Sequence, residues 1–278
     1  MENPYFRLIF AGGTCLAKAH KIVKRMSEDI DFKIQLKNKN LFFTKNQMLK
    51  ELKKFRTQIM KSLDSLILLI RSSAVRNEGR YLRIELTYPA LFIGDNTLRP
   101  HLLLEFTFAD VRLATNELSI NTIIEDTMKI DTLFSPIPID CISCDETAIE
   151  KWVALTRRIA AIERQYHYDD KTLVRHVYDL NAVKQAHQIN EIFFKLAKSI
   201  VFSDANQFKN QYPEYFKNPV AEISQSLLIL RNKKLWEERY QQFTNSMVYD
   251  RTDIPDYHAA ITSIEYISKM VITTLNYS

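Results

Sequence analysis

The chain has 278 residues, of which 46% are hydrophobic and 26% charged, with 38 Lys and Arg against 33 Asp and Glu. This composition is typical of a globular protein and excludes a disordered or fibrous one. No apolar run approaches the roughly 18–20 residues that span a bilayer, so we expect no membrane contact. Three cysteines are too few for a disulfide framework, and we therefore expect a reducing, cytoplasmic location.

The first half of the chain has the pattern of a mixed α/β unit. Alternation of apolar and polar residues predicts strands at 6–10, 30–34, 81–88 and 102–108. Apolar residues three and four positions apart predict amphipathic helices at 16–26 and 46–71. Residues 111–144 combine short strands or loops with two prolines.

From Glu146 the pattern is helical nearly to the end of the chain. Five helices are predicted there, at 149–162, 172–187, 190–200, 227–243 and 258–275. We therefore expect an α+β protein, in which an N-terminal core with a small mixed sheet, residues 1–144, precedes a C-terminal α-helical bundle, residues 145–278.

Two aspartates stand two residues apart on the second predicted strand. Asp29 and Asp31 leave the same face of that strand, because side chains alternate between its two faces. Adjacent carboxylates repel each other unless a cation lies between them, and carboxylate oxygens are ligands that Mg²⁺ prefers. The pair therefore indicates a site where a divalent metal is shared with substrate phosphates. The alternative interpretation is a solvated strand edge.

A glycine turn precedes this strand. Gly12, Gly13 and Thr14 offer backbone N–H groups at the start of a predicted helix, where the helix dipole favours a phosphate group. A turn for phosphates together with a pair of metal-binding aspartates is the layout that phosphoryl and nucleotidyl transfer need.

The segment from Gly12 to Phe32, in which a basic helix and Ser-Glu-Asp-Ile-Asp-Phe follow Gly-Gly-Thr, resembles the AbiEii/AbiGii toxin family of nucleotidyltransferases. This family belongs to the polymerase-β-like superfamily. Two later segments continue the resemblance in the same order. Residues 150–158 resemble the family's Glu-Lys-x-x-Ala-Leu…Arg helix, and residues 175–180 resemble its Arg-Asp-x-Tyr-Asp-Leu element, with His176 in place of the first aspartate.

The resemblance implies roles for particular residues. Asp29 and Asp31, with a third carboxylate on a later strand, would bind Mg²⁺ or Mn²⁺, and the third carboxylate would assist deprotonation of the acceptor. Glu105 is the best positional match for it, and Glu85 is the competitor. Residues of both halves would bind the nucleotide in a cleft that the helical bundle closes. They are Gly12, Gly13, Thr14, Ser27, Lys151, Arg158 and Asp179.

Some of these residues have structural alternatives. Ser27 could be a turn hydroxyl, and Arg158 and Asp179 could form an ion pair that braces two helices. The Cys141-x-x-Cys144 pair lacks the second pair of ligands that zinc takes, and it lacks the context of a redox motif.

Positive charge is concentrated near the aspartate pair. Residues 18–61 contain thirteen Lys or Arg against four Asp or Glu, a local excess of nine, whereas the whole chain has a net charge of +5. We expect this charge to surround the catalytic strand and to attract polyanions, RNA among them. The alternative is a solvated helix face, and no named nucleic-acid-binding module is present.

The expected reaction is transfer of a nucleoside monophosphate from an NTP to an acceptor hydroxyl, with release of pyrophosphate. The resemblance implies the toxin of a bacterial type IV toxin–antitoxin or phage-defence (abortive-infection) system, with a cognate antitoxin as partner and an RNA such as the tRNA 3′ end as acceptor. Two alternatives stay open. One is a nucleotidyltransferase that modifies a small molecule such as an antibiotic, and the other is a protein that binds nucleotide or RNA without catalysis.

Overall fold

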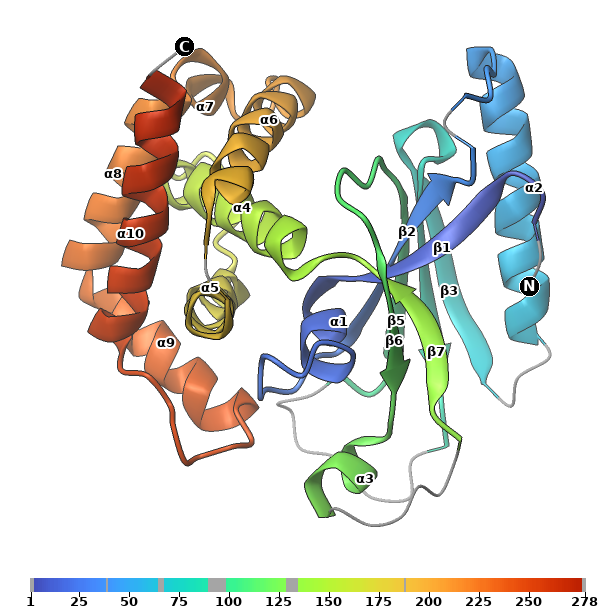
Figure 1. The fold of residues 1–278 in the computed structure, drawn as a ribbon, viewed down its shortest axis with the longest axis horizontal. Coiled ribbons are helices and arrows are strands. Elements are labelled where there is room, and N and C mark those ends of the chain that lie inside the picture. Colours follow the sequence, from blue (N-terminus) through green and yellow to red (C-terminus); the bar gives the residue numbers. More distant parts are fainter. Residues whose placement is uncertain are drawn as a thin grey trace. The chain divides into compact units, whose positions relative to one another are not determined.

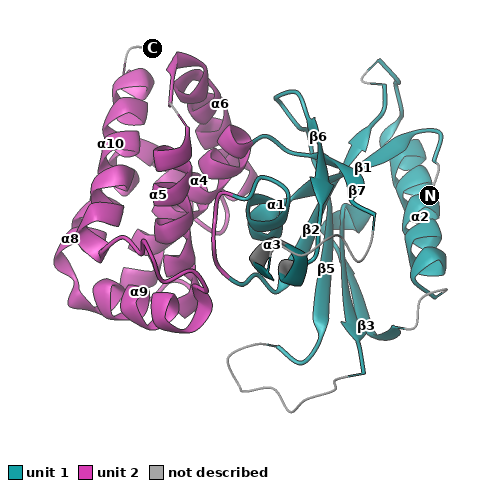
Figure 2. Cartoon of the chain, turned by 60° about the horizontal axis from the view of Figure 1, so that its bottom comes forward, with its two compact units in different colours: residues 1–21, 26–143 teal, residues 22–25, 144–278 magenta. Residues whose placement is uncertain are grey.

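A computed structural model of the chain describes residues 3–38, 40–64, 68–89, 99–128, 135–187 and 189–276. Its contacts divide the chain into two compact units (Figure 2). Unit 1 consists of residues 1–21 and 26–143, and unit 2 of residues 22–25 and 144–278. The short segment 22–25 therefore belongs to the helical unit, although it lies between two elements of unit 1 in the sequence.

Within the described residues, a seven-stranded mixed sheet forms the centre of unit 1, in the order β3-β4-β5-β2-β1-β7-β6 (Figure 1). The strands are β1 (Phe6–Ala11), β2 (Asp29–Leu36), β3 (Leu69–Arg76), β4 (Tyr81–Thr87), β5 (Leu102–Phe108), β6 (Asn116–Ile120) and β7 (Ile137–Cys141). Strand β2 pairs antiparallel with β1 and parallel with β5, so the strand that carries the aspartate pair is central.

Two helices lie on opposite faces of this sheet (Figure 1). The buried side chains of α2 (Lys45–Asp64) pack against even-numbered residues of β4 and β5, among them Ile84 and Phe106. The shorter helix α1 (Gly12–Lys18) joins a separate cluster with Ile9 and Cys141. Because side chains alternate along a strand, the odd-numbered residues of β2, β4 and β5 project from the face opposite α2. Helix α3 (Ile123–Met128) and the 3₁₀ turn η1 (Asn77–Gly79) complete the unit.

Unit 2 is a helical bundle. Its elements are α4 (Cys144–Glu163), η2 (Lys171–Val174), α5 (Arg175–Ala186), α6 (Glu191–Gln207), α7 (Pro213–Lys217), α8 (Pro219–Asn232), α9 (Lys234–Met247) and α10 (Tyr257–Asn276). Helix α4 contacts α5, α6 and α8. Its fully buried Trp152 donates the indole N–H to Ser268 Oγ of α10 at 2.8 Å, and Ser226 of α8 donates its hydroxyl to the Thr156 carbonyl at 2.6 Å. Burial on several sides makes α4 the core helix of the unit.

The predicted α+β fold is confirmed, but three element predictions are wrong. The helix predicted at 16–26 begins at Gly12 and ends at Lys18, and the one predicted at 46–71 ends at Asp64, after which β3 follows. Strand β3 is exposed on both faces, so its sequence lacks the alternation that a half-buried strand shows. The helix predicted at 227–243 is two helices that meet at Lys233.

The segment 22–25 is extended because it pairs with residues that follow α9. Arg25 forms an antiparallel bridge with Val248, and the Tyr249 N–H donates to the Lys24 carbonyl at 3.2 Å. These bonds replace those that a continued helix would have made. None of the described helices is both long enough and apolar enough to cross a membrane.

The core of unit 1 yields a first prediction. Phe55 of α2 is 1% exposed, so Phe55→Ala should lower the free energy of unfolding by about 3–5 kcal/mol. Lys53→Ala is the matched control, since Lys53 is exposed on the same helix. Urea unfolding followed by circular dichroism checks the pair, and equal midpoints for the two variants would contradict the packing described.

Candidate active site

Carboxylates from two neighbouring strands lie side by side on the sheet. In the parallel pairing of β2 with β5, Asp31 is opposite Glu105 and Asp29 is opposite Leu103. Paired residues project from the same face, and neighbouring strands are about 4.8 Å apart. Asp29, Asp31 and Glu105 therefore project from adjacent positions on the face opposite α2.

Glu85, the competing third carboxylate, lies one strand further away. It is on β4, where it pairs with Leu103, and its Oε1 is 2.9 Å from Arg83 Nη2. The strand order places β5 directly beside β2 and β4 beyond it. Glu105 is thus the carboxylate that neighbours the aspartate pair.

The glycine turn lies against Asp31. Ala11, the last residue of β1, pairs with Asp31, and Gly12 follows it with φ +74°. A Cβ atom at Gly12 would lie 1.9 Å from Asp31 Oδ2, so only glycine both adopts this backbone and leaves room for the carboxylate. The Thr14 hydroxyl donates to the Asp29 carbonyl and so ties α1 to the start of β2.

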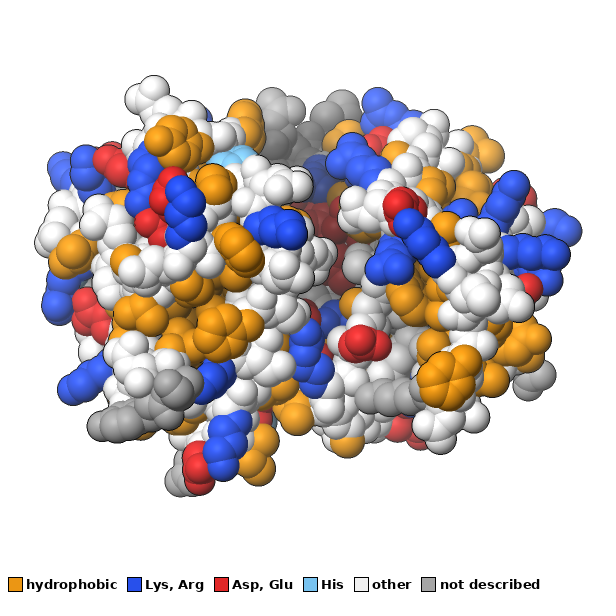
Figure 3. All heavy atoms as spheres, turned by 90° about the horizontal axis from the view of Figure 1, so that it is seen from above, with side chains coloured by type: hydrophobic (Ala, Val, Ile, Leu, Met, Phe, Trp, Pro, Cys, Tyr) orange, Lys and Arg blue, Asp and Glu red, His pale blue; other side chains and the backbone are white. Residues whose placement is uncertain are grey.

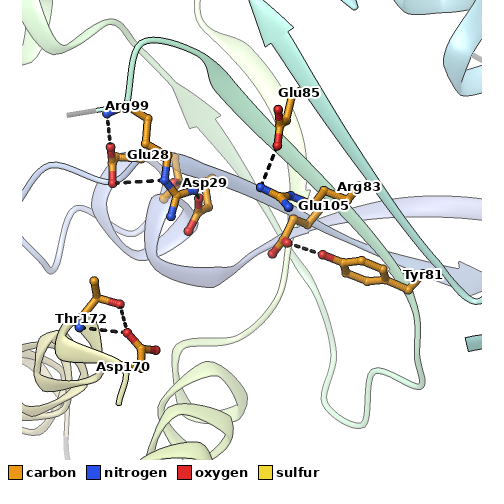
Figure 4. Close-up of polar contacts among 10 residues, drawn as sticks. Glu28, Asp29, Tyr81, Arg83, Glu85, Arg99, Glu105, Asp170 and Thr172 are labelled. Atoms are coloured by element: carbon orange, nitrogen blue, oxygen red, sulfur yellow. Dashed lines mark hydrogen bonds and ion pairs between the residues drawn. The ribbon is translucent and has the colours of Figure 1, made fainter. Parts of the chain in front are cut away.

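Two carboxylates of this row are bonded to side chains of unit 1 (Figure 4). Arg99 Nη1 donates to Asp29 Oδ1 at 2.6 Å, and the Tyr81 hydroxyl donates to Glu105. In the part of the chain that the structure describes, no three His, Cys, Asp or Glu side chains converge closely enough to hold a metal ion. The donor set still suits Mg²⁺ or Mn²⁺, since the register of β2 and β5 brings Asp31 and Glu105 side by side and both ions take oxygen ligands.

The Tyr81 phenol is a proton donor at neutral pH. Burial raises the pKa of this phenol, and its hydrogen bond to Glu105 raises the pKa further. A protonated phenol can donate only while Glu105 offers an oxygen to accept. This contact therefore fixes the direction in which the Glu105 carboxylate points.

In unit 2, a buried carboxylate binds two cations. Asp179 of α5 is fully buried and accepts from Arg25 Nε at 2.6 Å and Nη2 at 2.7 Å, while Lys151 Nζ of α4 is 2.9 Å away. Burial by itself would raise the pKa of Asp179, but Arg25 and Lys151 hold it far below its usual range. Burial lowers the pKa of Lys151, and Asp179 opposes that shift. With all three groups ionised, the cluster carries one net positive charge.

Arg158 is not part of this cluster. Its Nη2 is 2.8 Å from Asp170 Oδ2, and Asp170 also accepts from the backbone N–H and hydroxyl of Thr172 (Figure 4). The alternative in which Arg158 pairs with Asp179 is therefore wrong. His176 is half-buried, and its desolvation together with the charges of Lys151 and Arg175 lowers its pKa well below the usual value. Its imidazole is consequently neutral at pH 7.

The residues that the sequence singled out are distributed over the two units, and within unit 2 the structure brings Lys151 and Asp179 together but not Arg158. Unit 1 holds Gly12, Gly13, Thr14, Ser27, Asp29, Asp31 and Glu105, and unit 2 holds Lys151, Arg158 and Asp179. Sequence reasoning missed Arg25, Arg99 and Tyr81. Arg25 lies 154 positions from Asp179, a separation at which no local pattern signals a pair. The alternation of apolar and polar residues in β4 is a signal in the sequence that could have placed Tyr81 on the polar face.

The lysines of α2 do not surround the catalytic strand as the sequence suggested. Helix α2 packs on the sheet face opposite Asp29 and Asp31, and Lys and Arg side chains gather over this helix at the right of Figure 3. Its exposed basic residues include Lys45, Lys50, Lys53, Lys54 and Lys61. The alternation of β4 and β5 decides this, because their even-numbered residues are apolar and pack against α2.

Comparison with known proteins identifies related sequences and folds. A family model described as "Nucleotidyl transferase AbiEii toxin, Type IV TA system" matches residues 6–263. The fold is similar to that of MenT4, the nucleotidyltransferase toxin Rv2826c from Mycobacterium tuberculosis H37Rv, with 16% identity, a TM-score of 0.50, and coverage of 97% of this chain and 85% of that chain. An H. pylori protein described provisionally as a nucleotidyltransferase is 13% identical, with a TM-score of 0.40 and coverage of 97% and 88%. No curated protein matches the chain.

The buried cluster yields a prediction for stability. Asp179→Asn removes the carboxylate to which the buried Arg25 and Lys151 are both bonded, which should lower the free energy of unfolding at pH 7 by about 3–5 kcal/mol. Because folding depresses the pKa of Asp179, its contribution is complete above the unfolded-state pKa of about 3.9 and shrinks as the pH falls below it. The difference between wild type and variant should therefore narrow by about 1 kcal/mol between pH 7 and pH 3.

Urea unfolding at both pH values measures this difference. Glu238→Gln is the control, because Glu238 pairs with Lys234 on the solvated surface of α9 and its loss should leave the transition unchanged. An Asp179→Asn protein as stable as wild type at pH 7 would show that the cluster is not formed.

Proposed function

Because the chain belongs to the AbiEii family of nucleotidyltransferase toxins, we propose that it transfers a nucleoside monophosphate from an NTP to an acceptor hydroxyl and releases pyrophosphate. That the chain is a nucleotidyltransferase follows from the family itself. The choice of residues, metal and acceptor is the proposal. The observation that carries it is the register of β2 with β5, which sets Glu105 beside Asp31 with Asp29 two residues before.

Asp29, Asp31 and Glu105 would hold one or two Mg²⁺ or Mn²⁺ ions. When bound, such ions neutralise charge on the triphosphate and favour ionisation of the acceptor hydroxyl. The acceptor oxygen forms a bond to the α-phosphorus, and the bond from that phosphorus to the pyrophosphate oxygen breaks. Glu105 accepts the acceptor's proton, and Tyr81 keeps the carboxylate oriented by its hydrogen bond.

The nucleotide would be bound by backbone and cationic groups. Gly12, Gly13, Thr14 and Ser27 lie at the start of α1 and immediately before β2, where we propose that they contact the triphosphate. In unit 2, Lys151 keeps two further N–H donors besides the one directed at Asp179. We assign Lys151 and Arg158 to the phosphates, and Asp179 to holding Lys151 in place.

An RNA acceptor, such as a tRNA, is the acceptor class that this face supports best. Arg83 pairs with Glu105 across β4 and β5, and Arg76 pairs with Tyr81 across β3 and β4. Arg83 forms an ion pair with Glu85 on this face, and Arg76 adds a second cation on β3, so this part of the face has two cations against one carboxylate, which suits a phosphate backbone. A small acceptor such as an antibiotic would not need these basic residues beyond the carboxylates.

We also propose that the protein acts in the cytoplasm as the toxin of a type IV toxin–antitoxin system with a role in phage defence. The description of the matched family supports this, since it names that class of system. A cognate antitoxin is then the expected protein partner.

Substitution of the aspartates tests the proposed reaction. Asp29→Asn and Asp31→Asn should each lower nucleotidyl transfer at least about 100-fold, because each removes a charge that balances the metal. Glu85→Gln is the matched control on the same sheet face and should retain activity. The assay incubates the protein with each α-³²P-labelled NTP, MgCl₂ and either total RNA or a set of antibiotics. Label on antibiotics would favour the small-molecule alternative, and nucleotide binding without transfer would contradict catalysis.

Replacement of the turn glycine tests the placement of Asp31. Gly12→Ala brings a methyl group onto Asp31 Oδ2, so transfer should fall at least about 100-fold. Gly79→Ala imposes the same left-handed strain at φ +85°, but there the methyl group meets the flexible end of Arg56. If both variants lose the same activity, the loss reflects general strain and the specific contact with Asp31 is not needed.

A further inference from the structure

Arg99 is bonded to two consecutive acidic residues, Glu28 just before β2 and Asp29 at its start (Figure 4). Its backbone N–H donates to Glu28 Oε1, and its Nε is 3.9 Å from Glu28 Oε2. Its Nη1 donates to Asp29 Oδ1 at 2.6 Å. Both the main chain and the side chain of Arg99 are thus bonded to acidic residues, which keeps the guanidinium close to Asp29.

The guanidinium supplies the charge that a metal would otherwise supply. Asp29 projects from the same face as Asp31 and Glu105, so these groups repel one another unless a cation or a proton donor compensates them. Arg99 provides a cation to the first, and Tyr81 provides a donor to the third. In this arrangement, no three acidic, thiol or imidazole side chains of the described chain converge on one point.

We propose that Arg99 is a positioning residue that binds Asp29 through Oδ1 and competes with the divalent metal for this carboxylate. The inference rests on the proposed function, since it takes Asp29 as a metal ligand. A metal that coordinates Oδ1 of Asp29 requires that the Arg99 ion pair opens, and a metal that coordinates Oδ2 would lie beside the guanidinium charge. The competition follows from geometry and charge, because Oδ1 is 2.6 Å from a guanidinium nitrogen and a divalent ion on the same carboxylate would be repelled by that positive charge.

The competition has a measurable size. For coordination through Oδ1, the apparent dissociation constant for the metal equals the intrinsic constant divided by the fraction of chains in which the Arg99 ion pair is open. The Arg99 side chain is 38% exposed, so solvent weakens the pair and the effect is moderate. We expect Arg99→Gln to tighten metal binding by about fivefold.

The test is Mn²⁺ binding to the full-length, nucleotide-free chain, followed by the electron paramagnetic resonance signal of free Mn²⁺. Arg99→Gln should lower the apparent dissociation constant by about fivefold. Arg99→Lys should give a smaller change, because a lysine keeps the positive charge although it cannot bridge Glu28 and Asp29 in the same way. Arg71→Gln is the matched control, since it removes one exposed positive charge from β3 and leaves Asp29 untouched. It should bind Mn²⁺ as the wild type does.

Thermal unfolding gives a second readout that does not depend on activity. Without metal, Arg99→Gln leaves Asp29 without this cation and should melt below the wild type. With saturating Mn²⁺ its melting temperature should rise by more than that of the wild type, because stabilisation grows with the ratio of ligand concentration to dissociation constant.

Two outcomes would overturn the proposal in distinguishable ways. In the first outcome, the wild type binds Mn²⁺ and Arg99→Gln binds it no more tightly than Arg71→Gln does. This result would show that Arg99 does not compete with the metal, and the proposed function would stand. Wild type that binds no Mn²⁺, with Asp29→Asn behaving identically, would remove the metal site itself and the Arg99 inference with it.

Discussion

Mutual repulsion among carboxylates on one sheet face is the constraint on which the site depends. At about 5 Å and an effective dielectric constant of 20, two unit charges repel by roughly 3 kcal/mol. The pairing of Asp31 with Glu105, and the position of Asp29 two residues before, create this repulsion in the backbone itself. Arg99 and Tyr81 relieve it from within the chain. A divalent metal, if bound as proposed, would relieve it more completely, because it carries two positive charges where the guanidinium carries one.

A buried ion pair, between Arg25 and Asp179, has its arginine a few residues before these aspartates in the sequence. Arg25 reaches the buried Asp179, and only Met26, Ser27 and Glu28 separate Arg25 from Asp29. A buried ion pair gains little net stability over apolar packing, but removing one partner is costly. The pair therefore fixes the course of segment 22–25 within unit 2.

The sheet separates two kinds of charge. Even-numbered residues of β4 and β5 form the apolar face that α2 covers, and the basic side chains of α2 lie beyond that face. Odd-numbered residues carry Glu105, Arg83 and Tyr81 on the other face. The basic run of α2 therefore lies away from the carboxylates, and the basic residues beside them are Arg99, which precedes β5, and Arg83 of β4.

The sequence by itself determined the local elements and the residue types of the site. Alternation on β2 put Asp29 and Asp31 on one face, glycines marked the turn, and helical periodicity marked the second half, because each of these signals is encoded within about ten neighbouring residues. Only the tertiary structure decided that Glu105 is nearer than Glu85, that 22–25 is extended, that α2 lies on the far face, and that Arg25 and Arg99 contact the acidic residues. Strand order and ion pairing between distant residues depend on how the whole chain buries its apolar surface, and no short segment carries that information.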